Sequence, residues 1–191
     1  MSNNTIVQKT FEEHLNLIND CIKQLSSPIY EICVLIDKAI KNGNKILIFG
    51  NGGSAADAQH IAAEFTGRFV IERIGLPAIS LSTDTSALTA IGNDYGFEFI
   101  FSRQVEALAN KGDILLGIST SGNSKNVLNA FVAGDKIGTV NIGLCGNTGG
   151  EMSKILKNNI VVPSRITARI QEVHILIGHI ICQYIDSKYE A

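Results

Sequence analysis

The chain has 191 residues, of which 45% are hydrophobic and 18% are charged, and its formal net charge is −2. A chain this apolar can bury enough surface to fold, and its three prolines are too few for a collagen-like or low-complexity protein. The slightly negative charge gives no basic footprint for nucleic acid, so we expect no nucleic-acid partner. Soluble proteins average about 25% charged residues. The shortage of charge therefore indicates a membrane protein or a protein that covers much of its surface in an assembly.

A membrane protein is the less fitting of these two classes. A spanning helix needs about 20 consecutive apolar residues, and the longest apolar runs, at 45–50, 114–118 and 175–182, are much shorter. The first residues lack the basic start and apolar core of a signal peptide. We therefore expect a cytoplasmic protein without a membrane partner. The four cysteines form no CxxC pair, and we expect them to be small buried groups rather than disulfide partners.

The length predicts a single domain over residues 1–191, because no linker or repeat divides the chain. Residues 1–42 are predicted to form an N-terminal helical segment. We expect two helices there, separated near Ser26, Ser27 and Pro28, since a proline suits the first turn of a helix and a serine can cap it.

Residues 43–191 are predicted to form an α/β core. Short apolar runs at 45–49, 78–81, 113–118, 139–145 and 159–162 alternate with helical stretches, and a long helix over about 167–187 closes the chain. This pattern is typical of buried parallel strands joined by crossover helices. The predicted fold is a three-layer α/β sandwich with a five-stranded parallel sheet flanked by helices, to which the N-terminal helices are added. Ligands of such folds lie beyond the carboxyl ends of the strands.

A glycine loop follows the first predicted strand. Residues 50–55 read G-N-G-G-S-A and match the G-x-G-x-x-A variant of the dinucleotide fingerprint. The fingerprint also needs an acidic residue at the end of the second strand. Glu72 has about the right spacing but precedes that strand, so it matches this requirement poorly. The alternative is a tight turn in which Ser54 caps the following helix and Asp57 completes a capping box. That alternative leaves Asn51 unexplained.

A serine-rich loop follows the third predicted strand. The loop STSGNS at 119–124 offers the hydroxyls of Ser119, Thr120, Ser121 and Ser124 just before a predicted helix. The N-terminus of a helix favours an anion, so the loop suits a phosphate monoester, and no Walker lysine pattern points to a nucleoside triphosphate. The alternative is an ordinary turn capped by Ser124.

Two pairs of polar residues lie on predicted helices. His60 and Glu64 are four residues apart and share one helix face, and Gln171 and His179 share one side of the last helix. Taken alone, the first pair is more typical of a solvated i,i+4 contact.

Taken together, the segments GNGGSAADAQHIAAE, IGNDYGFE, GISTSGNS and RIQEVHILIGH resemble the phosphoheptose isomerases, bacterial members of the sugar-isomerase (SIS) domain family. The resemblance covers residues 45–185. It implies a phosphosugar isomerase that converts sedoheptulose 7-phosphate to D-glycero-D-manno-heptose 7-phosphate, the first step towards activated heptoses for lipopolysaccharide or other surface glycans. It also implies a homotetramer whose active sites lie between subunits.

The resemblance also implies a set of site residues. The implied ligands of one zinc ion per subunit are His60, Glu64, Gln171 and His179. The implied substrate-binding residues are Asn51, Gly52, Gly53, Glu64, Asn93, Asp94, Ser119, Thr120, Ser121, Ser124 and Gln171.

The implied chemistry is consistent with these residue types. An aldose–ketose isomerisation passes through an enediolate and needs a base at carbon, an acid/base at oxygen and a group that stabilises negative charge. Glu64 is the candidate base, His179 the candidate proton shuttle, and zinc a candidate Lewis acid. A zinc-bound carboxylate is a weaker base than a free one, so either Glu64 leaves the metal during the cycle or the two roles are shared.

A second function stays open on the same scaffold. Some SIS relatives bind the replication initiator DnaA without isomerase chemistry, and the site glutamate and terminal histidine are replaced in them. Both Glu64 and His179 are present here, which favours the enzyme. One departure from the family pattern is that Arg165 and Ile166 stand where many relatives have an acidic residue, which changes the expected charge near the site entrance.

Overall fold

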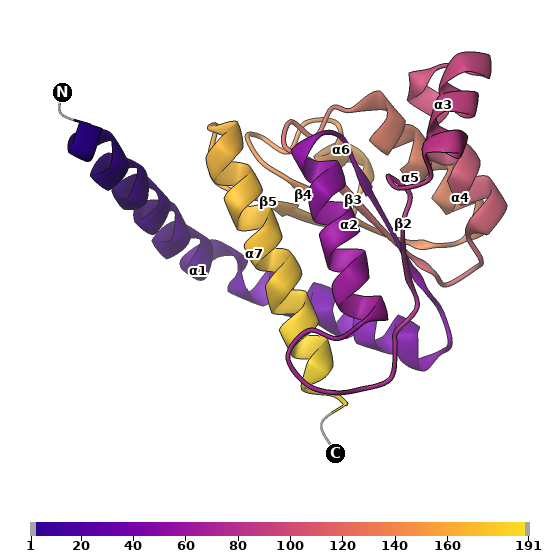
Figure 1. Ribbon diagram of the computed structural model, residues 1–191, viewed down its shortest axis with the longest axis horizontal. Coiled ribbons are helices and arrows are strands. Elements are labelled where there is room, and N and C mark those ends of the chain that lie inside the picture. The colour runs from indigo at the N-terminus through magenta and orange to yellow at the C-terminus, as the bar shows by residue number, and fades with distance from the viewer. Residues whose placement is uncertain (1–2, 190–191) are drawn as a thin grey trace.

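One parallel sheet forms the middle layer of the molecule (Figure 1). The computed structural model describes residues 3–189, and its strand order is β2-β1-β3-β4-β5. The strands are β1 (Ile46–Gly50), β2 (Ala78–Ser80), β3 (Ile114–Ser119), β4 (Val140–Cys145) and β5 (Asn158–Val161). Every neighbouring pair is parallel, and Ile46 lies opposite both Ala78 and Ile114. The predicted five-stranded parallel sheet is confirmed.

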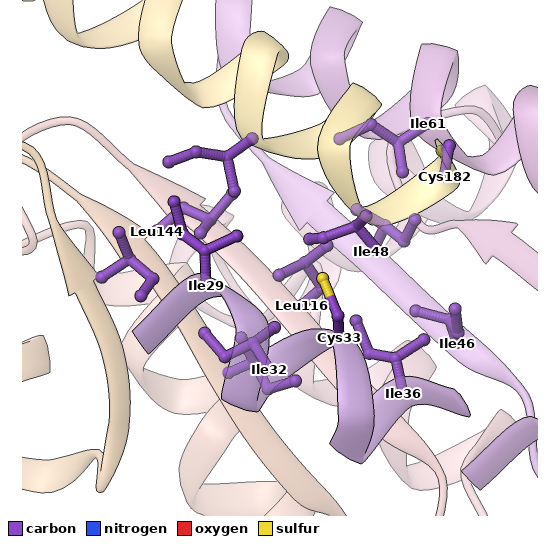
Figure 2. Packing of buried hydrophobic residues seen from close by; sticks show 14 of the residues in the cluster. Ile29, Ile32, Cys33, Ile36, Ile46, Ile48, Ile61, Leu116, Leu144 and Cys182 are labelled. Carbon is purple, nitrogen blue, oxygen red and sulfur yellow. The ribbon is translucent and has the colours of Figure 1, made fainter. Parts of the chain in front are cut away.

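Helices cover both faces of the sheet because successive strand side chains point to opposite sides. Ile46 and Ile48 pack with α1 (Asn3–Lys41), α2 (Gly53–Thr66) and α7 (Thr167–Asp186). Figure 2 shows this cluster, with Leu116 of β3 and Cys33 of α1 against the same face. Leu47 and Phe49 pack on the other face with α4 (Ser102–Leu108), α5 (Lys125–Ile137) and α6 (Met152–Ile155). The short elements α3 (Thr85–Asp94) and η1 (Phe97–Phe99) lie between β2 and α4 in the chain.

The N-terminal segment is one helix rather than the two that the sequence predicted. The helix α1 runs over 39 residues with Pro28 inside it. Leu25 and Ile29, on either side of the proline, are buried in the same cluster, so packing holds both halves in one helical register. The ring removes one backbone donor, and α1 bends along its length instead of ending (Figure 1). Ser26 donates its hydroxyl to the Ile22 carbonyl at 2.6 Å and does not act as a break.

The N-terminal end of α1 projects beyond the sheet (Figure 1), although Thr10 and His14 still contact α7. Large apolar side chains are exposed on it, among them Phe11 at 73% and Leu15 at 61% of their surface. No helix among the described residues combines the length and apolarity needed to cross a membrane. The four cysteines are buried and free, as predicted.

The carboxyl ends of the strands meet at one edge of the sheet, because the strands are parallel. The glycine loop after β1 and the serine loop after β3 therefore lie on neighbouring strands. The helices α2 and α7 both begin at this edge and run side by side away from it (Figure 1). This arrangement brings the glycine loop, the serine loop and the two helices that carry the predicted polar pairs into one region.

Candidate functional site

The glycine loop begins α2 without a side-chain cap. Gly52 is the residue before the helix and has a φ of 57°, which favours glycine. Ser54 is buried, and it makes no cap hydrogen bond because the helix already begins at Gly53. The carboxylate of Asp57 leaves Oδ2 buried without a hydrogen-bond partner. The predicted capping box at Ser54 and Asp57 is therefore wrong.

The dinucleotide alternative is also wrong. Glu72 follows the C-terminal end of α2, whereas the glycine loop precedes its N-terminal end. The Glu72 carboxylate is exposed and lies 3.7 Å from Arg68 Nε. It cannot reach a ribose bound at the glycine loop, since the 14-residue helix between them is about 20 Å long.

Asn51 pairs with a residue that the sequence analysis missed. Its amide donates to Asn126 Oδ1 at 2.9 Å, and the Asn126 amide donates back to Asn51 Oδ1 at 2.8 Å. This reciprocal pair joins the glycine loop to the first turn of α5. The position of Asn126, two residues after the serine loop, was the only signal in the sequence.

A pocket of about 310 Å³ opens beside this pair. Its lining residues are Asn51, Phe97, Glu98, Ser124, Lys125 and Asn126. Lys125 begins α5 and brings a positive charge next to the serine loop. No sequence motif marks Lys125, because it does not stand within a glycine-rich loop as a Walker lysine does.

The serine loop has its hydroxyls at the carboxyl end of β3. Ser119 is buried, and its Oγ lies 2.9 Å from Ser124 Oγ. Ser124 precedes α5 but makes no cap hydrogen bond with its side chain, so the simple cap does not account for it. The backbone carbonyl of Thr120 accepts hydrogen bonds from Gly146 N and from Asn147 Nδ2, at 3.1 and 3.2 Å. The loop is thus fixed to the loop after β4, with α5 directed away from it.

His60 of α2 contacts both Glu64 of the same helix and His179 of α7. Its Nε2 atom lies 3.1 Å from Glu64 Oε1 and 3.5 Å from His179 Nε2. The ring of Phe69 lies 5.4 Å from the His179 ring, measured between centroids. Asp57 lies one turn before His60, and burial raises the pKa of its carboxyl although both histidines oppose that shift. The predicted shared face of His60 and Glu64 is confirmed.

Gln171 lies over the start of α2 rather than beside His60. A Cβ atom at Gly53 would be 2.5 Å from Gln171 Nε2, so this amide lies directly against the start of α2. Asn93 donates to Asp94 Oδ1 at 2.8 Å, and both are exposed at the end of α3. Among residues 3–189 no hydrogen bond joins this pair to the serine loop. The predicted site residues therefore form three groups. These are the glycine and serine loops, a histidine–glutamate cluster made of His60, Glu64 and His179, and a separate Asn93–Asp94 pair.

The histidine–glutamate cluster has the donor types that zinc prefers. A carboxylate only accepts hydrogen bonds, and a neutral imidazole nitrogen carries at most one hydrogen. Here His60 Nε2 contacts one carboxylate oxygen of Glu64 and one imidazole nitrogen of His179. Donors around a tetrahedral zinc lie about 3.3 Å apart for bonds of about 2.0 Å, close to the two contacts of His60. In the described part of the chain, no three His, Cys, Asp or Glu side chains are already arranged as a metal-binding group.

Two arginines near these helices have other partners. Arg169 donates to the carboxylate of Glu172 and to the Thr10 carbonyl of α1. Arg68 lies near Glu72.

Comparison with known proteins gives consistent results. The model of the SIS domain family matches residues 11–146. The phosphoheptose isomerase of Aliarcobacter butzleri is 57% identical over 180 residues, which cover 94% of this chain and 95% of that protein. The structure of phosphoheptose isomerase GmhA from Neisseria gonorrhoeae has a TM-score of 0.91 and 47% identity over 96% of this chain and 98% of that one. A phosphoheptose isomerase from Francisella tularensis has a TM-score of 0.94 and 37% identity, over 98% of this chain and 100% of that one.

Proposed function

This chain belongs to the SIS domain family, among its phosphoheptose isomerases, and we propose that it interconverts sedoheptulose 7-phosphate and D-glycero-D-manno-heptose 7-phosphate. The observation that carries the proposal is the likeness to phosphoheptose isomerases over 94% of the chain or more. The activity is that of a phosphosugar isomerase in the biosynthesis of heptose for surface glycans. The DnaA-binding alternative finds no support among these relatives.

The serine loop supports a role in binding the phosphate group. Ser119 and Ser124 bring two hydroxyls within 2.9 Å of each other at the N-terminus of α5, and Lys125 adds a positive charge. Hydroxyls, a helix N-terminus and a lysine all favour a phosphate. The pocket beside Asn51 and Asn126 would take the sugar hydroxyls, since amides both donate and accept hydrogen bonds. Asn93 and Asp94 stay in the proposed substrate set from the family resemblance.

The cluster on α2 and α7 supports proton transfer between carbon and oxygen. Glu64 would remove the proton from the carbon next to the carbonyl and return it to the neighbouring carbon. His179 would hold or move a proton at the two substrate oxygens, which exchange carbonyl and hydroxyl character. His60 lies between these two groups and keeps them together. Phe69 packs its ring against the His179 ring.

We propose that His60, Glu64 and His179 hold a zinc ion, with Gln171 as a further ligand from the family resemblance. When bound, zinc would supply a Lewis acid that stabilises the negative charge on the enediolate oxygens. The support in this chain is that His60 Nε2 lies 3.1 Å from Glu64 Oε1 and 3.5 Å from His179 Nε2. Gln171 would need to turn from Gly53 towards the cluster to join them.

We also propose that residues 1–191 form a single SIS domain and that the protein works in the cytoplasm. Four copies would form a homotetramer with sites between subunits. Exposed apolar residues along α1, including Phe11 and Leu15, would be covered by neighbouring copies. An apolar groove of about 260 Å³ between α1 and α7, which includes Ile22 and Leu176, adds to this surface. Four free buried cysteines suit a reducing compartment.

The test of the proposed function is turnover of sedoheptulose 7-phosphate. Purified protein is incubated with the sugar phosphate, with and without added zinc, and the aldose product is followed by NMR. Formation of the heptose 7-phosphate is expected, and its absence under both conditions would overturn the proposal. Light scattering tests the assembly separately, and a monomer in solution would contradict the proposed tetramer and its sites between subunits.

A further inference from the structure

A buried ion pair joins the far ends of the two helices that carry the histidine–glutamate cluster. Arg73 Nε donates to Asp186 Oδ1 at 2.7 Å, and the two side chains are only 2% and 4% exposed. Asp186 is the last residue of α7, and Arg73 lies in the segment 67–77 between α2 and β2. A buried pair of charges is costly unless its remaining polar atoms are also hydrogen-bonded.

Arg73 uses its remaining donors on the end of α2. Its Nη2 donates to the carbonyl of Glu64 at 2.9 Å, and its Nη1 donates to the carbonyls of Phe65 and Ile74, both at 3.0 Å. Glu64 and Phe65 lie in the last turn of α2, whose carbonyls lack partners within the helix. Arg73 therefore holds the backbone of Glu64 directly while its charge is balanced by Asp186.

Asp186 uses its second oxygen on the loop that covers His179. Its Oδ2 accepts hydrogen bonds from Val70 N at 2.8 Å and from Ile71 N at 3.2 Å. The residue before Val70 is Phe69, whose ring packs against His179. One carboxylate at the end of α7 therefore fixes the backbone next to the ring that covers the proposed proton shuttle.

We propose that Arg73 and Asp186 are positioning residues for the isomerisation. They hold the backbone of Glu64 and the loop of Phe69, and so they set how Glu64 and His179 face each other across α2 and α7. Neither residue touches the reacting atoms. The inference rests on the proposed function, because it takes Glu64 and His179 as the groups that transfer protons. A misplacement of about 1 Å can lower a rate roughly a hundredfold.

The rival explanation is that the pair only stabilises the fold. The chain offers a matched control in Lys45 and Asp113, whose Nζ and Oδ2 atoms lie 2.6 Å apart with side chains 20% and 2% exposed. This second buried pair precedes β1 and β3, at the amino edge of the sheet. That edge is opposite the glycine and serine loops. Neutralising the carboxylate of either pair leaves its cation without a partner, but only the Arg73–Asp186 pair contacts the site helices.

The experiment compares Asp186→Asn with Asp113→Asn. We measure kcat and KM for sedoheptulose 7-phosphate at a temperature at which circular dichroism shows both variants to be folded. Both substitutions are expected to lower the midpoint of urea unfolding. Only Asp186→Asn is expected to lower kcat, by roughly tenfold to a hundredfold. Its KM should change by less than about twofold, because the proposed phosphate contacts lie at the other end of α2.

Two further variants separate the parts of the assignment. Arg73→Lys keeps the charge but loses the planar fork that reaches Glu64, Phe65 and Asp186 together, and it should also lower kcat. Phe69→Leu removes the ring beside His179 without touching the ion pair, and it should lower kcat at a temperature at which the variant is folded. These two variants decide the matter if Asp186→Asn does not fold.

The positioning role is overturned if the folded variants keep the wild-type kcat, or if Asp113→Asn loses as much kcat as Asp186→Asn. An inactive wild type has a different meaning. It would overturn the proposed function and this inference with it, whereas active wild type with unchanged variants would overturn the positioning role alone.

Discussion

The Nε2 atoms of His60 and His179 lie 3.5 Å apart, although 119 residues separate them in the chain. The contact exists because α2 and α7 begin at the same edge of the sheet and run side by side (Figure 1). Each helix supplies one half of the cluster, Glu64 from α2 and His179 from α7. Neither helix alone carries both the proposed carbon base and the proposed proton shuttle. The proposed chemistry therefore depends on the packing of α2 against α7.

Replacement of Glu64 by Gln tests the carbon base. The amide keeps the shape of the side chain but cannot accept a proton, and we expect kcat to fall by about 10²–10⁴ or more. The midpoint of thermal unfolding and the oligomeric state should stay as in the wild type, because Glu64 is only partly buried. Turnover followed by NMR is the measurement, and wild-type activity in Glu64→Gln would remove this residue as the base.

Removal of a histidine tests the zinc assignment. We expect freshly purified protein to contain about one zinc ion per chain, since structural and catalytic sites commonly bind a single ion. His60→Ala should lose the metal and most of the activity, and a chelator should inactivate the wild type. His14→Ala is the matched control, because His14 lies on α1 and its Nδ1 is 2.7 Å from Glu172 Oε2, away from the cluster. Elemental analysis decides the point: wild type without zinc, together with a rate that chelation does not change, would contradict the assignment.

The strands and the long helices could be predicted because each depends on a local pattern. The apolar runs and the spacing of Ile32 and Ile36 report directly on burial, and the sheet and α7 follow within a residue or two. The break at Pro28 was predicted wrongly because the same local rule ignores packing. Buried residues on both sides of the proline keep α1 continuous.

The site could be predicted only in part, for a related reason. The spacing of His60 and Glu64 places them on one face of a helix, but their approach to His179 depends on the packing of α2 against α7. Asn126 carries no motif, and its importance comes from its amide pair with Asn51 across 75 residues. The family resemblance anticipated the contact of His60 with His179, whereas nothing in the sequence anticipated the pairing of Asn51 with Asn126.

Loss of a hydroxyl tests the phosphate site. Ser119→Ala removes a buried group that lies 2.9 Å from Ser124 Oγ. Hydrogen bonds to charged groups contribute about 1.5–3 kcal/mol, so we expect KM for the sugar phosphate to rise roughly tenfold to a hundredfold. Ser187→Ala at the end of α7 is the control, since its hydroxyl donates only to the Tyr184 carbonyl. Equal KM values for Ser119→Ala and Ser187→Ala would show that the serine loop does not bind the phosphate.

His174 gives the fold a pH dependence that is separate from the proposed zinc site. Its side chain is fully buried, its Nε2 lies 3.1 Å from the Cys145 carbonyl, and its Nδ1 has no hydrogen-bond partner. Burial lowers the pKa of this imidazole from 6.5 to about 4. The unfolded chain therefore binds a proton below pH 6.5 while the folded chain does not. The free energy of unfolding therefore keeps its full value above pH 6.5. Protonation of His174 in the unfolded chain lowers it by about 3 kcal/mol in total as the pH falls from 6.5 towards 4.

His174→Leu is the variant that isolates this effect. It should unfold at lower urea concentration than the wild type at pH 7.5, because the Cys145 carbonyl loses its partner, at a cost of about 1–3 kcal/mol. The difference between the two proteins should then shrink as the pH falls from 6.5 to 4, since only the wild type contains this imidazole. Asp113 and Asp186, whose pKa values are lowered by hydrogen bonds and nearby cations that outweigh the effect of burial, titrate in both proteins and cancel in the comparison. Urea unfolding at a fixed protein concentration measures the difference, and a constant gap between the two curves across this pH range would show that His174 is not the group responsible.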